Sequence, residues 1–154
     1  MFGRPPQTPN VLAAPMPAHH IHMFVTTTAL LIPYTYPTMP IDDPLAIERK
    51  EGKTSGTVIF QLNGPVTLRN LFDLQPHLRS GDQPRVSILD LSGVPYMDSA
   101  GMGAIVNYYV HCQNKGVKLI VAGVSSRVME LFKMTRVDTI MSFAPSVETA
   151  EASL

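Results

Sequence analysis

Residues 85–110 combine a strand-like run, a short loop and a helical pattern, and this order of elements leaves the chain few possible folds. Residues 85–92 alternate and are rich in branched apolar side chains, which is typical of a buried strand. The apolar residues that follow recur at helical spacing: Met102, Ile105, Val106, Tyr109 and Val110. Asp98 and Ser99 lie where the loop meets the helix, so both are candidates to cap its free backbone N–H groups.

Two strand-like runs precede this unit, at residues 45–50 and 57–62, and a Gly-rich turn separates them. This pattern predicts a β-hairpin, which Asn63, Gly64 and Pro65 then terminate. A helix is predicted to begin at Leu68, after Thr67 as a candidate cap. Its apolar side carries Leu71, Leu74 and Leu78. Pro76 falls inside this pattern, so the helix is expected to kink there or to end early.

Strands and helices continue to alternate to the end of the chain. The predicted elements are a helix over 99–114 ended by Gly116, a strand over 117–122, a helix capped by Ser125 or Ser126, a short strand over 139–143 and a final helix capped by Ser146. This alternation favours an α/β fold with a mostly parallel sheet and right-handed crossovers. Ile88 and Leu89 lie in mid-strand and are expected to be buried against different layers.

The motif Asp-Ser-Ala-Gly-Met-Gly at residues 98–103, placed after a hydrophobic strand, resembles the signature of the STAS family. The best-known members of that family are bacterial anti-sigma factor antagonists. The resemblance covers residues 45–154, with supporting segments at 57–64, 86–91, 118–123 and 128–134. It implies an α/β sandwich in which a mostly parallel sheet of four or five strands, with an N-terminal hairpin, is packed by about four helices.

The resemblance also implies a function. Ser99 matches the serine that the anti-sigma factor, itself a serine kinase, phosphorylates. The unphosphorylated domain would bind this kinase and free its sigma factor; phosphorylation would end the complex, and a PP2C-type phosphatase would reset it. The implied partner-binding residues are Thr67, Tyr96, Asp98, Ser99, Gly101 and Met102. Many family members carry an acidic residue at the position of Thr67, so this chain departs from the usual pattern there.

The chemistry of a helix start is consistent with phosphorylation at Ser99. A phosphate adds a charge of about −1.5 to −2 and three acceptor oxygens. The free N–H groups and the dipole of a helix N-terminus favour an anion, so the domain would stay folded while its contact surface changes sign. The alternative from local sequence alone is that Asp98 and Ser99 form a plain helix cap without any regulatory role.

The residues give no indication of catalysis, of a cofactor or of a metal site in the domain. The sequence has neither a Gly-x-Ser-x-Gly motif nor a phosphate-binding Gly-x-x-x-x-Gly-Lys-[ST] loop, and His77 and His111 fall in helical patterns as surface residues. The formal net charge is +0, which gives no reason to expect a nucleic-acid partner. Two rival functions stay open: a separate accessory subunit of a membrane lipid or anion transporter, and an enzyme of unrecognised type.

Residues 1–44 differ in composition from the domain, which is expected to span 45–154. They hold nine of the 14 prolines, which predicts a poorly ordered tail. The apolar segment 23–32 is shorter than the about 20 residues that span a bilayer and lacks the features of a secretory signal, so no membrane insertion is expected. The sequence further suggests that translation starts at Met39; a peptide from residues 1–38 in native extract would contradict this.

The histidines of the tail and the single cysteine indicate neither a metal site nor a disulfide. His19, His20 and His22 lie in the tail without a neighbouring carboxylate or cysteine, so they are interpreted as solvated side chains rather than as metal ligands. The single cysteine, Cys112, cannot form an internal disulfide and is expected to be buried in its helix. A cytoplasmic protein fits this cysteine usage.

Deleting residues 1–40 is expected to leave the melting temperature of the domain nearly unchanged, because a Pro-rich segment buries little apolar area. Differential scanning calorimetry of the full and shortened chains checks this. A drop of more than about 5 °C, which corresponds to about 1 kcal/mol or more for a domain of this size, would show that the tail packs on the domain.

Overall fold

The structure is a computed structural model that describes residues 44–154. The expectations for the Pro-rich tail, its apolar segment, its three histidines and a start at Met39 therefore lie outside the described residues.

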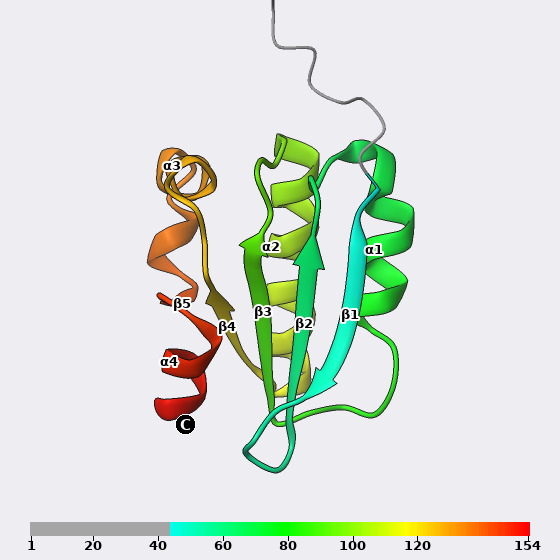
Figure 1. Cartoon of the computed structure of the whole chain (residues 1–154), viewed down its shortest axis with the longest axis vertical. Coiled ribbons are helices and arrows are strands. Elements are labelled where there is room, and N and C mark those ends of the chain that lie inside the picture. Colours follow the sequence, from blue (N-terminus) through cyan, green and yellow to red (C-terminus); the bar gives the residue numbers. More distant parts are fainter. Residues whose placement is uncertain (1–43) are drawn as a thin grey trace, which may run out of the picture. The chain divides into compact units, whose positions relative to one another are not determined.

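One five-stranded sheet organises the domain, and its strands are arranged in the order of the chain (Figure 1). The strands are β1 (Ala46–Glu51), β2 (Thr57–Asn63), β3 (Val86–Gly93), β4 (Lys118–Ala122) and β5 (Ser142–Ala144). β1 and β2 form the antiparallel hairpin, and the three remaining pairs are parallel. The mostly parallel sheet with an N-terminal hairpin is therefore confirmed.

Helices cover both faces of this sheet. They are α1 (Leu71–Leu78), which follows the short 3-10 turn η1 (Leu68–Asn70), α2 (Ser99–Lys115), α3 (Ser126–Met134) and α4 (Val147–Ala152); a second 3-10 turn, η2, spans Val137–Thr139. Residues of α1, α2 and α3 pack into the larger apolar core on one face. α4 covers a smaller core on the other face.

The central strand β3 supplies residues to both cores, because successive side chains of a strand point to opposite faces. Leu89 and Leu91 belong to the larger core, whereas Ile88 packs with Ile120 and with Ala150 of α4 in the smaller one. Ile88 and Leu89 are each 0% exposed. The prediction that these two residues face different layers is confirmed.

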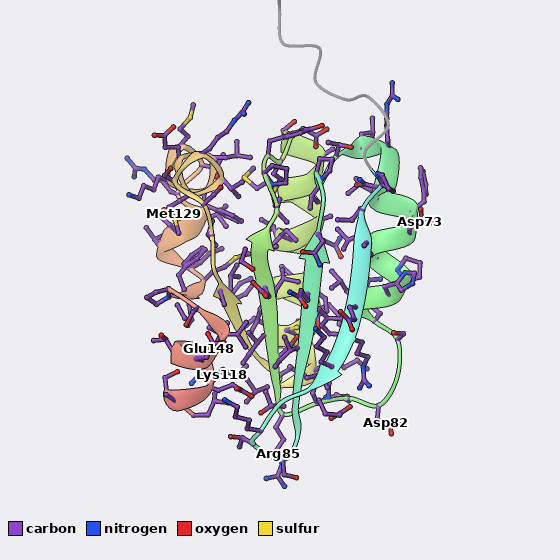
Figure 2. The ribbon with its side chains drawn as sticks, in the orientation of Figure 1. Asp73, Asp82, Arg85, Lys118, Met129 and Glu148 are labelled. Carbon is purple, nitrogen blue, oxygen red and sulfur yellow. The ribbon has the colours of Figure 1, made fainter. Side chains whose placement is uncertain are left out.

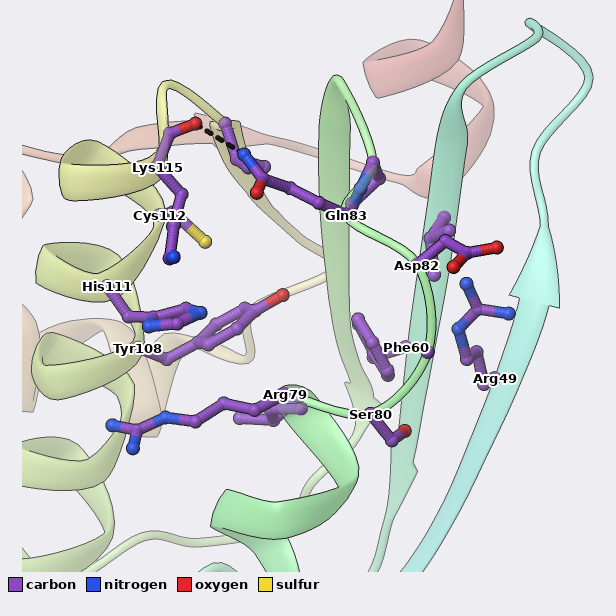
Figure 3. Close-up of a pocket in the computed structure, with 15 residues that line it drawn as sticks. Arg49, Phe60, Arg79, Ser80, Asp82, Gln83, Tyr108, His111, Cys112 and Lys115 are labelled. Carbon is purple, nitrogen blue, oxygen red and sulfur yellow. Dashed lines mark hydrogen bonds between the residues drawn. The ribbon is translucent and has the colours of Figure 1, made fainter.

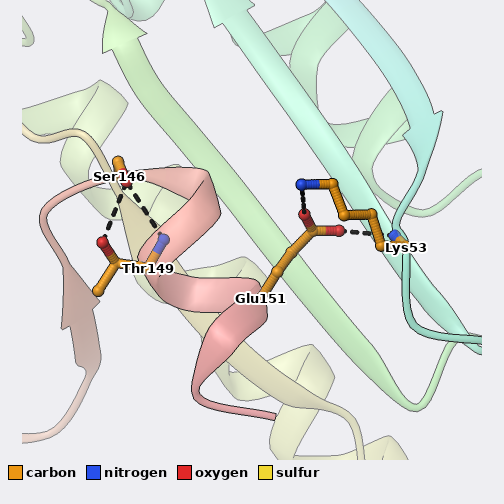
Figure 4. A network of polar contacts seen from close by, with 4 residues as sticks. All are labelled: Lys53, Ser146, Thr149 and Glu151. Atoms are coloured by element: carbon orange, nitrogen blue, oxygen red, sulfur yellow. Dashed lines mark hydrogen bonds and ion pairs between the residues drawn. The ribbon is translucent and has the colours of Figure 1, made fainter.

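Side-chain contacts tie the short helix α4 to the hairpin (Figure 4). A carboxylate oxygen of Glu151 accepts the backbone N–H of Lys53 at 2.7 Å, and the other pairs with Lys53 Nζ at 3.7 Å. Ser146 caps the helix by accepting the backbone N–H of Thr149 at 3.2 Å. Charged side chains such as Asp73, Arg85 and Glu148 are exposed around the domain (Figure 2).

The structure corrects the last predicted strand. The segment predicted to be a strand over 139–143 begins instead within η2, and only Ser142–Ala144 pairs with β4. Arg136 adopts a left-handed conformation with φ 58°, and the Thr139 hydroxyl donates to its carbonyl oxygen at 2.7 Å. This local hydrogen bond closes a turn where apolar composition alone favoured a strand.

The buried face of α2 also differs from the prediction. Besides Gly101, it consists of Ala104, Ile105, Tyr108 and Cys112, whereas Val110 is 49% exposed. Tyr108 takes part in the core because its hydroxyl pairs with that of the buried Ser87 at 2.8 Å. The predicted end of α2 is correct, since Gly116 caps it with φ 69°. α1 ends at Leu78, two residues after Pro76, and Cys112 is buried as expected.

Candidate functional site

Two loops run side by side at the carboxyl ends of the parallel strands and hold the start of α2. The loop after β2 contains Val66, and the loop after β3 contains Met97; the two residues form an isolated parallel bridge. The N–H of Val66 donates to the carbonyl of Tyr96 at 3.2 Å, and the N–H of Asp98 donates back to Val66 at 3.1 Å. The conformation of residues 94–98, the loop that leads into the signature motif, is therefore set by a segment about 30 residues earlier in the chain.

Asp98 is the N-cap of α2, and its carboxylate binds two backbone N–H groups. Oδ1 accepts from Gly101 at 2.7 Å, within the first turn of the helix. Oδ2 accepts from Leu68 at 3.0 Å, at the start of η1. One side chain thus joins the starts of two helical segments, and Ser99, the first residue of α2, is not the cap.

Ser99 is exposed, and its hydroxyl has no hydrogen-bond partner among residues 44–154. The N–H of Met102 donates to the carbonyl of Asp98 at 2.9 Å. In the same described part of the chain, the N–H groups of Ser99 and Ala100 have no partner. The site therefore offers a hydroxyl and two open backbone donors at a helix N-terminus, where the helix dipole favours negative charge.

Arg127 of α3 and Thr135, which directly follows this helix, complete the surroundings of the signature. The guanidinium of Arg127 lies 5.9 Å from the centroid of the Tyr96 ring, in a cation–π contact. The Thr135 hydroxyl lies 3.2 Å from the sulfur of Met102. Tyr96 and Met102 are half-buried. Neither Arg127 nor Thr135 could be predicted as part of the site, because no local pattern brings positions about 30 apart together.

Thr67, the residue at the position that is acidic in many family members, is half-buried at the N-cap position of η1. Its N–H donates to the side chain of Asn70 at 3.0 Å. The amide of Asn70 in turn donates to the carbonyl of Pro65 at 2.7 Å. Asn70 therefore fixes the loop beside the signature, a positioning role that the sequence did not reveal.

Three exposed apolar side chains lie on the segments that contact the start of α2. Leu68 (62% exposed) donates its N–H to Asp98, and Phe72 (84%) lies one helical turn further along the chain. Met134 (83%) precedes Thr135, which contacts Met102. We call Leu68, Phe72, Ser99, Met102 and Met134 the signature surface. Large apolar side chains that are this exposed are candidates for contact with a protein partner.

The two glycines of the signature have different roles. Gly101 is buried, and a Cβ atom there would clash with the carbonyl of Val66, lying 2.8 Å from its carbon atom. Gly101 is thus a packing residue that lets the two loops approach α2, rather than an exposed contact for a partner. Gly103 is exposed, and a Cβ atom there would meet nothing within 4 Å.

Gly101→Ala is expected to destabilise the domain by about 1–3 kcal/mol, because the added methyl group forces the loop of Val66 away from α2. Gly103→Ala is the matched control. It should stabilise the domain by about 0.5–1 kcal/mol, since alanine in an exposed helix interior loses less entropy than glycine. Urea unfolding of both variants measures this difference. Equal effects would contradict the close approach of the loop.

Other polar groups of the described domain lie apart from Ser99. No group of three or more His, Cys, Asp or Glu residues within 44–154 could hold a metal ion. His77 Nδ1 lies 2.6 Å from the carbonyl of Asp73, and His111 stacks on Tyr108, so neither imidazole is aimed at the signature. Among residues 44–154, no helix is both long and apolar enough to cross a bilayer.

The STAS domain model matches residues 49–150. Solved structures share the fold, among them two with a TM-score of 0.61. A sulfate transporter family protein from Wolinella succinogenes is 27% identical and aligns over 73% of this chain and 94% of its own. A putative anti-sigma factor antagonist from Thermotoga maritima is 20% identical and aligns over 70% of this chain and 92% of its own.

A mammalian sequence is also similar. Solute carrier family 26 member 10 of Mus musculus is 34% identical over 73 residues, which are 47% of this chain. That alignment covers 10% of the mouse protein, so the chain spans about a tenth of the length of this curated relative. Because the family model extends over most of the described residues, from β1 to α4, the chain belongs to the STAS domain family.

Proposed function

We propose that this domain is a non-catalytic regulatory module of the anti-sigma factor antagonist type, acting in the cytoplasm. It binds an anti-sigma factor kinase through the signature surface while Ser99 is unphosphorylated. Transfer of the γ-phosphoryl group of ATP to the Ser99 hydroxyl, with loss of the hydroxyl proton, releases ADP and ends the complex. A PP2C-type phosphatase then hydrolyses the phosphate ester and restores the hydroxyl.

The observation that carries this proposal is the position of Ser99. Its hydroxyl is exposed at the first residue of α2 and has no partner within the described domain, while Asp98 alone caps the helix. Phosphorylation therefore costs the fold no hydrogen bond that this hydroxyl makes to the domain. The open N–H groups of Ser99 and Ala100 favour the added anion, so the fold tolerates the modification while the surface gains charge.

The apolar part of the signature surface supports a switch in binding. Phe72 and Met134 expose most of their side chains on the segments that flank α2. In this proposal the partner covers the whole signature surface and so desolvates Ser99 as well, which favours a neutral hydroxyl over a phosphate at that position.

A second candidate function is that of a STAS module serving a membrane anion transporter. It is favoured by the similarity to proteins whose names include a sulfate transporter family and a solute carrier family. Thr67 in place of an acidic residue adds weight to this candidate, because the loop beside Ser99 then departs from the pattern of many family members.

A pull-down from native extract separates the two candidates, with wild type and Ser99→Ala as baits. We expect both to retain a serine kinase, and added Mg-ATP to release it from wild type but not from Ser99→Ala, which has no hydroxyl to modify. Retention of a transporter polypeptide instead, unaffected by ATP, would favour the second candidate. Equal release of the kinase from both baits would contradict a role for Ser99.

A further inference from the structure

A cavity of about 280 Å³ lies between α2, the loop of residues 80–84 and the hairpin (Figure 3). It is at the opposite end of the sheet from Ser99. Its lining includes Pro84, just before β3, and Val117, just before β4, whereas Ser99 follows the carboxyl end of β3. The function proposed for Ser99 therefore makes no use of this cavity.

The inner wall of the cavity is apolar, except for the Tyr108 hydroxyl, which pairs with Ser87. Phe60 and Tyr108 meet edge to face, with ring centroids 6.1 Å apart, and Leu78 and Cys112 line the same wall. The Tyr108 hydroxyl lies 2.8 Å from that of the buried Ser87, so one of the two donates to the other. Such a wall suits the apolar part of a ligand.

The mouth of the cavity is rich in cations. Its lining contains Arg49, Arg79 and Lys115, against one carboxylate, Asp82. Arg49 also lines a second space of about 350 Å³, which shares Val58 and Gly81 with the first. One of its amino groups pairs with Glu51 at 3.1 Å, and its guanidinium retains further donors.

The loop of residues 80–84 forms the outer wall of this space. Gln83 on the loop donates to the carbonyl of Lys115 at the end of α2, at 2.6 Å. Gly81 has a positive φ of 82°, and a Cβ atom there would lie 3.3 Å from the guanidinium carbon of Arg49. The loop thus packs close to Arg49 on one side and is hydrogen-bonded to α2 on the other.

We propose that this cavity binds a small organic acid with an unbranched apolar chain, its carboxylate on Arg49 and its chain against Phe60 and Tyr108. The guanidinium suits a carboxylate because two parallel N–H groups can donate to the two oxygens. The volume corresponds to that of about nine water molecules, which limits the ligand to a medium-length chain. This inference is independent of the role of Ser99.

The test uses the full chain and two probes of similar length, octanoate and 1-octanol. Two-dimensional NMR should show octanoate shifting backbone amides of residues 79–83 and 108–115, with weaker binding of the alcohol. The single cysteine gives a second, site-specific readout. Burial raises the pKa of the Cys112 thiol, so it reacts slowly with a methanethiosulfonate reagent, and octanoate should slow that reaction further.

Arg49→Gln should weaken octanoate binding about tenfold or more, the usual effect of losing a charged hydrogen bond. Lys118→Gln is the matched control, since Lys118 is an exposed cation at the same end of the sheet that does not line the cavity. Circular dichroism verifies the fold of both variants. Absence of octanoate binding at millimolar concentration, shifts confined to other residues, or equal binding of acid and alcohol by wild type would overturn the proposal.

Discussion

Replacing Ser99 with aspartate is expected to leave the domain folded and to weaken partner binding roughly 30- to 5,000-fold. The fold should survive because Asp98, not Ser99, caps α2, and a negative charge in the first turn of a helix is mildly favourable. Binding should suffer because the new charge lies on the signature surface, which a partner must desolvate. Burying an unpaired charge at an interface costs about 2–5 kcal/mol.

Two control variants isolate this effect. Ser99→Ala removes the hydroxyl but adds no charge, and it should keep both the binding surface and the Asp98 cap. Ser55→Asp makes the same chemical change on the exposed hairpin turn, at the other end of the sheet, and should leave binding unchanged. Circular dichroism verifies the fold, and calorimetric titration with the captured partner gives the affinities. If Ser99→Asp binds as tightly as Ser99→Ala, the charge at this position has no regulatory effect.

Leu89→Ala should lower the free energy of unfolding by about 2–5 kcal/mol. Leu89 is 0% exposed in β3, where it contributes to the larger core beneath the helices. Truncation removes buried methyl groups and leaves a cavity, because strands on both sides and helices on the face prevent the wall from collapsing into it.

Urea unfolding measures this loss, and Leu154→Ala is the matched control. Leu154 is 43% exposed at the end of the chain, so its truncation should change the free energy of unfolding by less than about 0.5 kcal/mol. A loss below about 1 kcal/mol for Leu89→Ala would be incompatible with a central, covered β3.

The sequence predicted the elements whose signals are local and strong. β3 was evident from its alternating branched residues, and α2 from its polar start and from Gly116, whose φ of 69° marks the helix end. The hairpin followed from two strand-like runs around a Gly-rich turn. The strand predicted over 139–143 was wrong at its start. Residues 137–140 form a turn instead, because hydrogen bonds within the turn outweigh the preference of apolar residues for a strand.

The site was predicted less completely, because its geometry depends on contacts between distant segments. Asp98 binds the N–H of Leu68, 30 positions away, and Met102 contacts Thr135, 33 positions away. No periodicity or motif encodes such pairs. The helical pattern placed Tyr109 in the apolar stripe and left out Tyr108. This prediction is wrong, because Tyr108 is the buried residue and its hydroxyl pairs with that of Ser87, a contact across the core that no local pattern encodes.

The most direct measurement of the switch is phosphosite mapping by mass spectrometry, after incubation of the full chain with the captured kinase and Mg-ATP. The proposed function predicts one phosphate, on Ser99, and none on the Ser99→Ala variant. It further predicts that the phosphorylated protein no longer binds the kinase in a calorimetric titration. A phosphate on another serine, such as the exposed Ser92, or a phosphorylated Ser99 that leaves the affinity unchanged, would contradict it.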